Sequence, residues 1–177
     1  MALQNILLAG FGGQGILFAG KVAAYSGLMD GKEVSWLPSY GPEMRGGTAN
    51  CSVCISDDPI GSPLVLAPGA LLAMNIQSYD KFIDAVVPGG IAVIDSTLVD
   101  KKCSRTDITC VYVPATALAN EKELSGLANI ILLGTLLKHT GFATEEAVEK
   151  AISKCVPPKK QHLLEPNMRA VRLGMEY

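Results

Sequence analysis

The chain has 177 residues, of which 49% are hydrophobic and only 18% are charged, with a formal net charge of −2. This length lets one domain bury its own core, and the hydrophobic content excludes disorder as the dominant state. The weak negative charge, with no basic run, argues against nucleic-acid binding. Because soluble domains usually carry about 25% charged residues, we expect a partner chain to cover part of the surface. A homodimer of the isolated chain is one form that this association can take.

Neither a membrane segment nor an export signal is predicted. Residues 1–5 lack a basic region and a cleavage site, so they do not resemble a signal peptide. The most apolar stretch, Leu127 to Leu137, spans eleven residues, whereas a bilayer needs about 20. The five cysteines are an odd number in a chain of ordinary size, which fits a reducing cytoplasm better than a disulfide framework. We therefore expect a cytoplasmic protein.

Strands and helices alternate along the chain. Short apolar runs predict strands at 6–9, 33–37, 48–55, 70–75, 91–95 and 109–113. Helical spacing and end signals predict helices at 16 to about 27, 78–87 with Ser78 as its cap, 127–139, 144–153 and 165–173. Continuously apolar strands are typical of a mainly parallel sheet covered on both faces. We predict one domain over 1–177, a Rossmann-like three-layer α/β sandwich with a helical C-terminal third.

The first predicted turn is rich in glycine. It reads Gly10-Phe11-Gly12-Gly13-Gln14-Gly15 and lies between a strand and a helix, the context that the Gly-x-Gly-x-x-Gly pattern requires. Glycines let a backbone approach a ligand closely, and the N–H groups at a helix start attract anions. Gly12, Gly13, Gln14 and Gly15 are therefore candidate binding residues. The alternative is that the glycines only permit a tight turn and close helix–strand packing.

The sequence around the second predicted strand argues against a nicotinamide-binding site. Such a site needs an acidic residue at the end of that strand, but Leu37 and Pro38 stand there and Glu33 lies at its start. A P-loop is excluded because no Gly-Lys-Ser/Thr follows the glycine loop. A free-standing nucleotide-binding protein of the Rossmann type stays open as an alternative.

A second candidate loop, residues 38–47, follows the second strand. In a parallel sheet it leaves the same carboxyl edge as the glycine loop, where such folds bind ligands. Its candidate binding residues are Tyr40, Glu43, Arg45, Gly46 and Gly47. The Arg45 guanidinium beside two glycines suits a phosphate or carboxylate. Two alternatives stay open: a solvated Glu43–Arg45 pair, or a docking patch formed with Trp36.

Other polar candidates have simpler explanations. Cys51 and Cys54 have Cys-x-x-Cys spacing, but a strand points them to opposite faces, so we expect buried free thiols. Asp95 ends a strand and either contacts a ligand or caps the next segment. His139 and His162 have no partner in the sequence, which favours surface or capping roles. No catalytic or metal-binding residue is predicted.

Several strings together resemble one family. They are the Gly10–Gly15 loop, Ser39-Tyr-Gly-Pro-Glu-Met-Arg-Gly-Gly47, residues 55–60 and 62–63, residues 129–134, and Asn167-Met-Arg-Ala170. The chain resembles, over nearly its whole length, the gamma subunit of 2-oxoacid:ferredoxin oxidoreductases. The Tyr-Gly-Pro-Glu-x-Arg-Gly-Gly string is the specific part of this resemblance.

The resemblance implies a subunit without the catalytic cofactors. Such a complex converts a 2-oxoacid, coenzyme A and oxidised ferredoxin to acyl-CoA, carbon dioxide and reduced ferredoxin. Thiamine diphosphate and magnesium would lie on alpha and beta subunits, and iron–sulfur clusters on a ferredoxin-like delta subunit. Ferredoxin or another acceptor would take the electrons, and coenzyme A would be the co-substrate near the two candidate loops.

The sequence itself lacks the motifs that would bind these cofactors. The chain has no Gly-Asp-Gly segment of the kind that holds diphosphate in thiamine enzymes, and no four-cysteine run for a cluster. We therefore expect the isolated chain to be inactive. The resemblance slightly favours 2-oxoglutarate over pyruvate or branched-chain oxoacids. A purely structural subunit, with both loops as docking surfaces, stays open.

Overall fold

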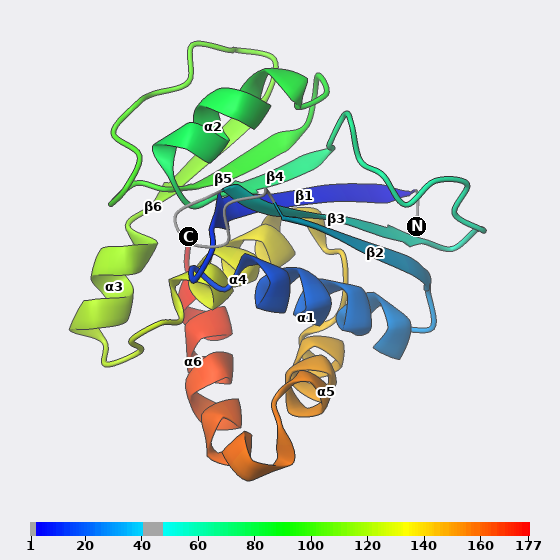
Figure 1. The fold of residues 1–177 in the computed structure, drawn as a ribbon, viewed down its shortest axis with the longest axis vertical. Helices are drawn as coiled ribbons and strands as arrows, with labels where there is room; N and C mark the ends of the chain where they lie inside the picture. The colour runs from blue at the N-terminus through cyan, green and yellow to red at the C-terminus, as the bar shows by residue number, and fades with distance from the viewer. Residues whose placement is uncertain (1–2, 41–47) are drawn as a thin grey trace.

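The structure is a computed structural model that describes residues 3–40 and 48–177. The strands of this part form one six-stranded sheet in the order β2-β3-β1-β4-β5-β6 (Figure 1). Their bounds are β1 (Gln4–Phe11), β2 (Glu33–Tyr40), β3 (Thr48–Ser56), β4 (Ala70–Ala73), β5 (Ile91–Asp95) and β6 (Thr109–Val113).

The sheet is mixed, although five of its strands run in one direction. β1, β4, β5 and β6 pair in parallel, whereas β3 lies between β1 and β2 and is antiparallel to both. The predicted α/β class and the parallel majority are confirmed; the position of β3 could not be read from the sequence. β2 continues to Tyr40, three residues past its predicted end at Leu37. Pro38 does not end it, because β2 is an edge strand and proline is tolerated there.

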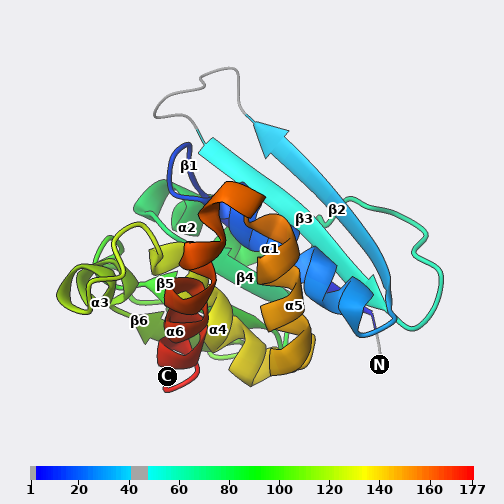
Figure 2. The same cartoon turned by 90° about the horizontal axis from the view of Figure 1, so that it is seen from below.

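Helices cover both faces of the sheet unequally (Figures 1 and 2). One face carries α1 (Ile16–Met29), α4 (Ala128–Thr140), α5 (Glu145–Cys155) and α6 (Leu164–Gly174), with the 3₁₀ segment Pro158–Leu163 before α6. The other carries α2 (Ile76–Phe82) and the 3₁₀ segment η1 (Ile83–Ala85). The short α3 (Ala115–Glu121) follows β6 at the side of the sheet. The predicted three layers and helical C-terminal third are therefore present.

The core consists of two hydrophobic clusters, one on each face. Ile6 and Leu8 of β1 pack in the cluster with α1 and α4, whereas Leu7 between them packs in the cluster with α2. Because alternate strand residues point to opposite faces, a strand that is buried on both faces has to be continuously apolar. Cys51 and Cys54 follow the same rule: each lies in a different cluster, and both are free thiols, as predicted.

Some helix ends differ from the prediction. The side chain of Asn75, not Ser78, caps α2, because Asn75 Oδ1 accepts the Ser78 N–H at 2.8 Å. α2 also ends early, at Phe82, and continues as a 3₁₀ turn to Ala85. α3 was not predicted. The start of α5 agrees with the predicted range 144–153, since Thr144 Oγ1 accepts the Ala147 N–H at 3.2 Å and so caps the helix.

Candidate functional site

The two candidate loops leave the same edge of the sheet. β1 ends at Phe11 opposite Thr48, and β2 ends at Tyr40 opposite Ala49. Since β1 and β2 are both antiparallel to β3, they run in the same direction, as the prediction required. Residues 41–47 lie outside the described residues, and with them the predicted binding residues Glu43, Arg45, Gly46 and Gly47. Tyr40 is described by its backbone alone, so its role also stays a prediction.

The glycine loop lies at a switch point of the sheet. β1 and β4 are parallel neighbours, but the helix that follows β1 covers one face, whereas the helix that follows β4 covers the other (Figure 1). In open α/β sheets, ligands bind in the crevice that forms outside the carboxyl ends of two such strands. The fold therefore puts residues 12–15 where a ligand is expected.

Gly13 and Gly15 of this loop are constrained to glycine in different ways. Gly15 precedes α1 with a φ of 73°, and a Cβ there would lie 2.5 Å from Nδ2 of Asn129. Asn129 Nδ2 donates to the Gly15 carbonyl at 2.9 Å, which ties the loop to α4. Gly13 also has a positive φ, 95°, yet a Cβ there would meet nothing within 4 Å. Turn geometry and packing explain Gly15, while Gly13 faces open space.

Gln14 holds the loop in place through its side chain. Its Oε1 accepts the Phe11 N–H at 2.6 Å and the Asn75 Nδ2 at 3.1 Å, and its Nε2 donates to the Met74 carbonyl at 3.2 Å. The amide thus spans the crevice between the ends of β1 and β4. Gln14, which the sequence suggested as a binding residue, has its side-chain hydrogen bonds directed to the protein.

The backbone of the loop offers hydrogen-bond donors. Within the described part of the chain, the N–H groups of Gly12, Gly13 and Gly15 have no hydrogen-bond acceptor. α1 begins without a side-chain cap and without an acidic residue in its first turn. The first N–H groups of a helix lack partners and carry partial positive charge. The loop is therefore suited to an anion such as a phosphate.

Two pockets flank the loop. One, of about 220 Å³, lies between the loop and β3 and is lined by Gly12, Gly13, Leu17, Phe18 and Ala49. The other, of about 230 Å³, lies on the β4 side and is lined by Gly13, Gln14, Met74, Leu98, Thr116 and Asn120. Gly13 borders both. Neither Phe18 nor Asn120 was a sequence candidate, because no local pattern marks a residue that the fold brings to a loop.

Of the two roles predicted for Asp95, ligand contact and capping, the structure supports capping. It ends β5 at the ligand-binding edge, but its carboxylate is buried and accepts the Thr97 N–H at 3.0 Å and the Thr116 Oγ1–H at 2.5 Å. It caps the segment after β5 and fixes Thr116 at the wall of the second pocket. Asp95 therefore stabilises the wall of this pocket through Thr116.

Asn129, at the first turn of α4, leaves one polar atom unsatisfied. The residue is 3% exposed, and its Oδ1 has no hydrogen-bond partner among the described residues. Such buried, unpaired acceptors are uncommon and cost stability. Asn129 is the first residue of the segment 129–134 that carries part of the family resemblance, and it contacts the glycine loop.

The remaining candidates are remote from the site or unreactive. Cys51 lies under α1, and burial raises the pKa of its thiol to about 12. His139 is exposed, with Nε2 3.3 Å from the Tyr177 carbonyl oxygen, and His162 is exposed on the 3₁₀ segment before α6. Across 3–40 and 48–177, no three potential metal ligands cluster and no helix could cross a bilayer.

The fold and site define a class: an α/β protein with a glycine loop at the switch point of a mixed sheet. The family described as pyruvate ferredoxin/flavodoxin oxidoreductase matches residues 5–177, so the chain belongs to that family. It is 40% identical to the 2-oxoglutarate synthase subunit KorC of Methanocaldococcus jannaschii, over 98% of this chain and 92% of the relative. It is 38% identical to the ketoisovalerate oxidoreductase subunit VorA of Methanothermobacter thermautotrophicus, over 98% of this chain but 36% of that longer subunit.

Solved structures support the same assignment. The gamma subunit of a keto/oxoacid ferredoxin oxidoreductase from Geobacter sulfurreducens superposes with a TM-score of 0.83 at 32% identity, over 98% of this chain and 96% of that one. The 2-oxoglutarate:ferredoxin oxidoreductase of Magnetococcus marinus, solved with 2-oxoglutarate, coenzyme A and succinyl-CoA, gives a TM-score of 0.88 at 23% identity, over 99% of this chain and 31% of that one. The second likeness concerns the fold alone.

The comparisons do not favour the alternative of a free-standing nucleotide-binding protein. The topology argues against it as well, because β3 separates β2 from β1. In a dinucleotide-binding fold the acidic residue that holds the ribose ends the strand next to β1. An antiparallel strand occupies that position in this sheet.

Proposed function

We propose that this chain is the gamma subunit of a cytoplasmic, thiamine diphosphate-dependent 2-oxoacid:ferredoxin oxidoreductase, with 2-oxoglutarate as its substrate. The reaction converts 2-oxoglutarate, coenzyme A and oxidised acceptor to succinyl-CoA, carbon dioxide and reduced acceptor. The match to the KorC subunit over nearly the full length of both chains supports this substrate. The match to VorA covers a third of that subunit and gives less support for a branched-chain oxoacid.

The role proposed for this chain is to bind coenzyme A. The observation that carries it is the set of backbone donors of Gly12, Gly13 and Gly15 at the start of α1, between two pockets. Coenzyme A carries a pyrophosphate and a third phosphate, which such donors bind well. The Arg45 guanidinium, five residues beyond the end of β2 in the sequence, would add a charged contact from the second loop.

Carbanion stabilisation in this reaction comes from thiamine diphosphate, and electron transfer needs iron–sulfur clusters. The donor set of this chain does not fit a cluster. Cys51 and Cys54 point to opposite faces of β3. Of the other three cysteines, Cys155 packs against the same cluster as Cys51, whereas Cys103 and Cys110 pack against the cluster on the opposite face. We therefore assign these cofactors and magnesium to alpha, beta and ferredoxin-like delta subunits, and expect no activity from the chain alone.

Affinity purification of the tagged chain from its native host at low salt tests the proposal. The eluate is assayed for coenzyme A-dependent reduction of a viologen dye with 2-oxoglutarate, pyruvate and 2-oxoisovalerate in parallel. We expect larger subunits to co-elute with an activity that prefers 2-oxoglutarate. A preference for another oxoacid would overturn the substrate assignment, and a lone chain with bound nucleotide and no activity would overturn the subunit assignment.

A further inference from the structure

Helices cover one face of the sheet over only part of its width. Leu71 of β4 and Ala92 of β5 pack on this face in the same cluster as residues of α2 and η1. Over β2 and β3, the described part of the chain covers the same face with the connection 57–69, which runs from β3 to β4 and forms no helix or strand (Figure 1). The two parts of the face therefore differ in what lies over them.

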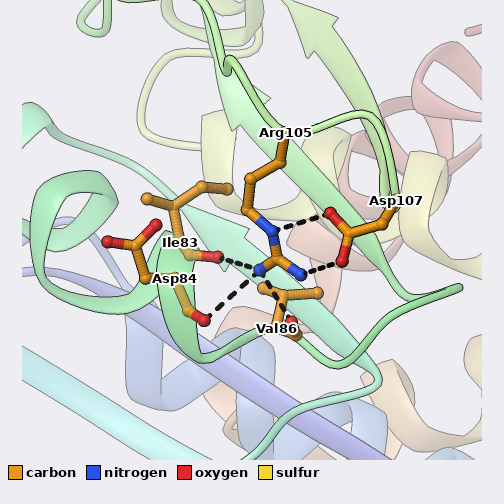
Figure 3. A network of polar contacts seen from close by, with 5 residues as sticks. All are labelled: Ile83, Asp84, Val86, Arg105 and Asp107. Carbon is orange, nitrogen blue, oxygen red and sulfur yellow. Dashed lines mark hydrogen bonds and ion pairs between the residues drawn. The ribbon is translucent and has the colours of Figure 1, made fainter.

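The part under α2 is closed by the chain itself (Figure 3). Arg105, from the connection between β5 and β6, donates through Nη1 to the carbonyls of Val86 at 2.8 Å and Ile83 at 3.0 Å. Its guanidinium also pairs with Asp107 at 2.6 Å. These bonds fasten the connection to η1, so the part of this face that stays open to another protein is the one over β2 and β3.

Contacts with β3 place the connection 57–69 on the α2 face. The Val65 N–H donates to Ser52 Oγ at 3.1 Å, and the Cys54 thiol donates to the Ser62 carbonyl at 3.7 Å. Val65 and Cys54 belong to the hydrophobic cluster that contains α2. Leu37 of β2 stands directly opposite Ser52, and residues paired across two strands share a face of the sheet. Leu37 and the connection are therefore neighbours on this face.

Three leucines are exposed on this part of the face. Leu64 and Leu66, on either side of the buried Val65, are 53% and 76% exposed, and Leu37 is 38% exposed. A single exposed leucine is common on a protein surface, but a group of apolar residues on one face is typical of an interaction site. Leu37, Leu64 and Leu66 form what we call the leucine surface.

The leucine surface carries no charge of its own. The sequence has no charged residue at 34–40, 48–56 or 59–69, the segments that form and underlie this surface. An ion pair joins Lys32, just before β2, to Asp57, just after β3, at the ends of these segments. Protein–protein interfaces have the same order, with a core depleted in charged residues and a polar rim. The matching partner surface is therefore also apolar.

The lengths of the relatives indicate which partner this is. The match covers 92% of the KorC subunit but only 36% of the VorA subunit, so in VorA the same domain is joined covalently to a further polypeptide segment. A covalent link keeps two domains at a high effective concentration without a strong interface. A separate gamma subunit, the role proposed above for this chain, has to hold the corresponding partner through its surface, and burial of apolar area is the main driving force for this.

We propose that the leucine surface docks this chain onto the subunit of its complex that corresponds to the remaining part of VorA. The inference rests on the proposed function, because it needs a multisubunit complex. Leu64 and Leu66 are the apolar anchors of the interface, and they lose their solvent exposure against an uncharged surface of that subunit. Because apolar contacts are not screened by ions, the association resists high salt.

Purification of the tagged chain from its native host, at low and at high salt, tests the docking surface. Co-eluting subunits are identified by peptide mass spectrometry, through their match to the part of VorA that this chain does not cover. The double variant Leu64→Asp/Leu66→Asp is expected to retain about a tenth or less of the wild-type amount of that subunit, since an interface that buries two unpaired carboxylates is strongly disfavoured. Leu28→Asp is the matched control. Leu28 is 51% exposed near the end of α1, on the opposite face of the sheet, and its variant is expected to retain the wild-type amount.

The conservative variant Leu64→Met/Leu66→Met keeps the surface apolar and is expected to co-elute like wild type. Thermal unfolding of each isolated variant checks that it is folded. Equal recovery of the subunit with Leu64→Asp/Leu66→Asp would overturn the docking surface and leave the proposed function intact. Release of the subunit from wild type by high salt would overturn it as well, because charged contacts would then hold the complex. A wild-type chain that elutes without any larger subunit would instead contradict the proposed function.

A second copy of the chain is the competing occupant of the leucine surface. Light scattering of the isolated chain measures its oligomeric state. A wild-type dimer that Leu64→Asp/Leu66→Asp converts to a monomer, while the larger subunit still co-elutes with the variant, would assign the surface to self-association and overturn the proposal.

Discussion

The side chain of Gln14 and the carbonyl of Met74 lie 60 residues apart in the chain but are joined by a hydrogen bond of 3.2 Å. This bond links the loop after β1 to the end of β4, across the crevice in which a ligand of this fold is expected. With its other two bonds, to Phe11 and Asn75, the amide sets the conformation of the glycine loop. We therefore predict that the glycine backbone contacts the ligand and that Gln14 holds this backbone in position.

Replacing Gln14 by alanine should destabilise the chain. The change removes three hydrogen bonds and leaves part-buried backbone groups of Phe11 and Met74 without partners. Such losses cost about 1–3 kcal/mol. Urea unfolding of Gln14→Ala measures the effect, and Gln77→Ala on the exposed face of α2 serves as the control, with a change within about 0.5 kcal/mol. Equal effects of the two substitutions would contradict the bridging role.

Gly13 and Gly15 should respond differently to alanine. Gly15→Ala combines a positive φ with a contact of 2.5 Å to the Asn129 amide, so we expect a large loss of stability. Gly13→Ala meets nothing within 4 Å and should cost only the left-handed conformation, about 1–2 kcal/mol. Its methyl group, however, enters the space between the two pockets. In the assembled complex we therefore expect Gly13→Ala to raise the KM for coenzyme A while the KM for the oxoacid stays unchanged.

An unchanged KM for coenzyme A in the folded Gly13→Ala complex would indicate that the glycines of this loop only permit a tight turn. That outcome would support the alternative in which the glycines have no ligand.

Arg45→Ala separates coenzyme A binding from subunit docking. Loss of a charge-assisted hydrogen bond costs about 1.5–3 kcal/mol, so we expect the KM for coenzyme A to rise roughly 10- to 100-fold. Gel filtration of the complex should show unchanged assembly. Dissociation of this chain from the complex would favour a docking role for the loop, and normal activity in an intact complex would contradict both roles for Arg45.

The buried thiol of Cys51 predicts a loss of stability at high pH. Burial raises its pKa from 9.0 to about 12, so between these values the unfolded chain releases a proton that the folded chain keeps. Its contribution is fully present below pH 9 and decreases above it, by up to about 1.4 kcal/mol per pH unit. The difference in unfolding free energy between wild type and Cys51→Ala, measured from pH 8 to 10, should shrink accordingly. A constant difference would show that Cys51 does not titrate in this way.

Local patterns predicted the α/β class, most strands and the first turn of α5, because apolar runs and caps are local signals. The position of β3 was not predictable, since pairing of β3 with both β1 and β2 depends on which strands meet in three dimensions. The same limit applies to Gln14. Its sequence position suggested a ligand contact, but its partners Met74 and Asn75 lie in the connection between β4 and α2, which no pattern near Gln14 reveals.

An add-back assay tests whether the complex needs this chain to use coenzyme A. The complex is purified from a host that lacks this chain, and 2-oxoglutarate- and coenzyme A-dependent reduction of a viologen dye is measured before and after addition of the purified chain. We predict little or no activity without the chain and recovery with wild type but not with Arg45→Ala at low coenzyme A. Full coenzyme A-dependent activity in the absence of the chain would show that the other subunits bind coenzyme A without it.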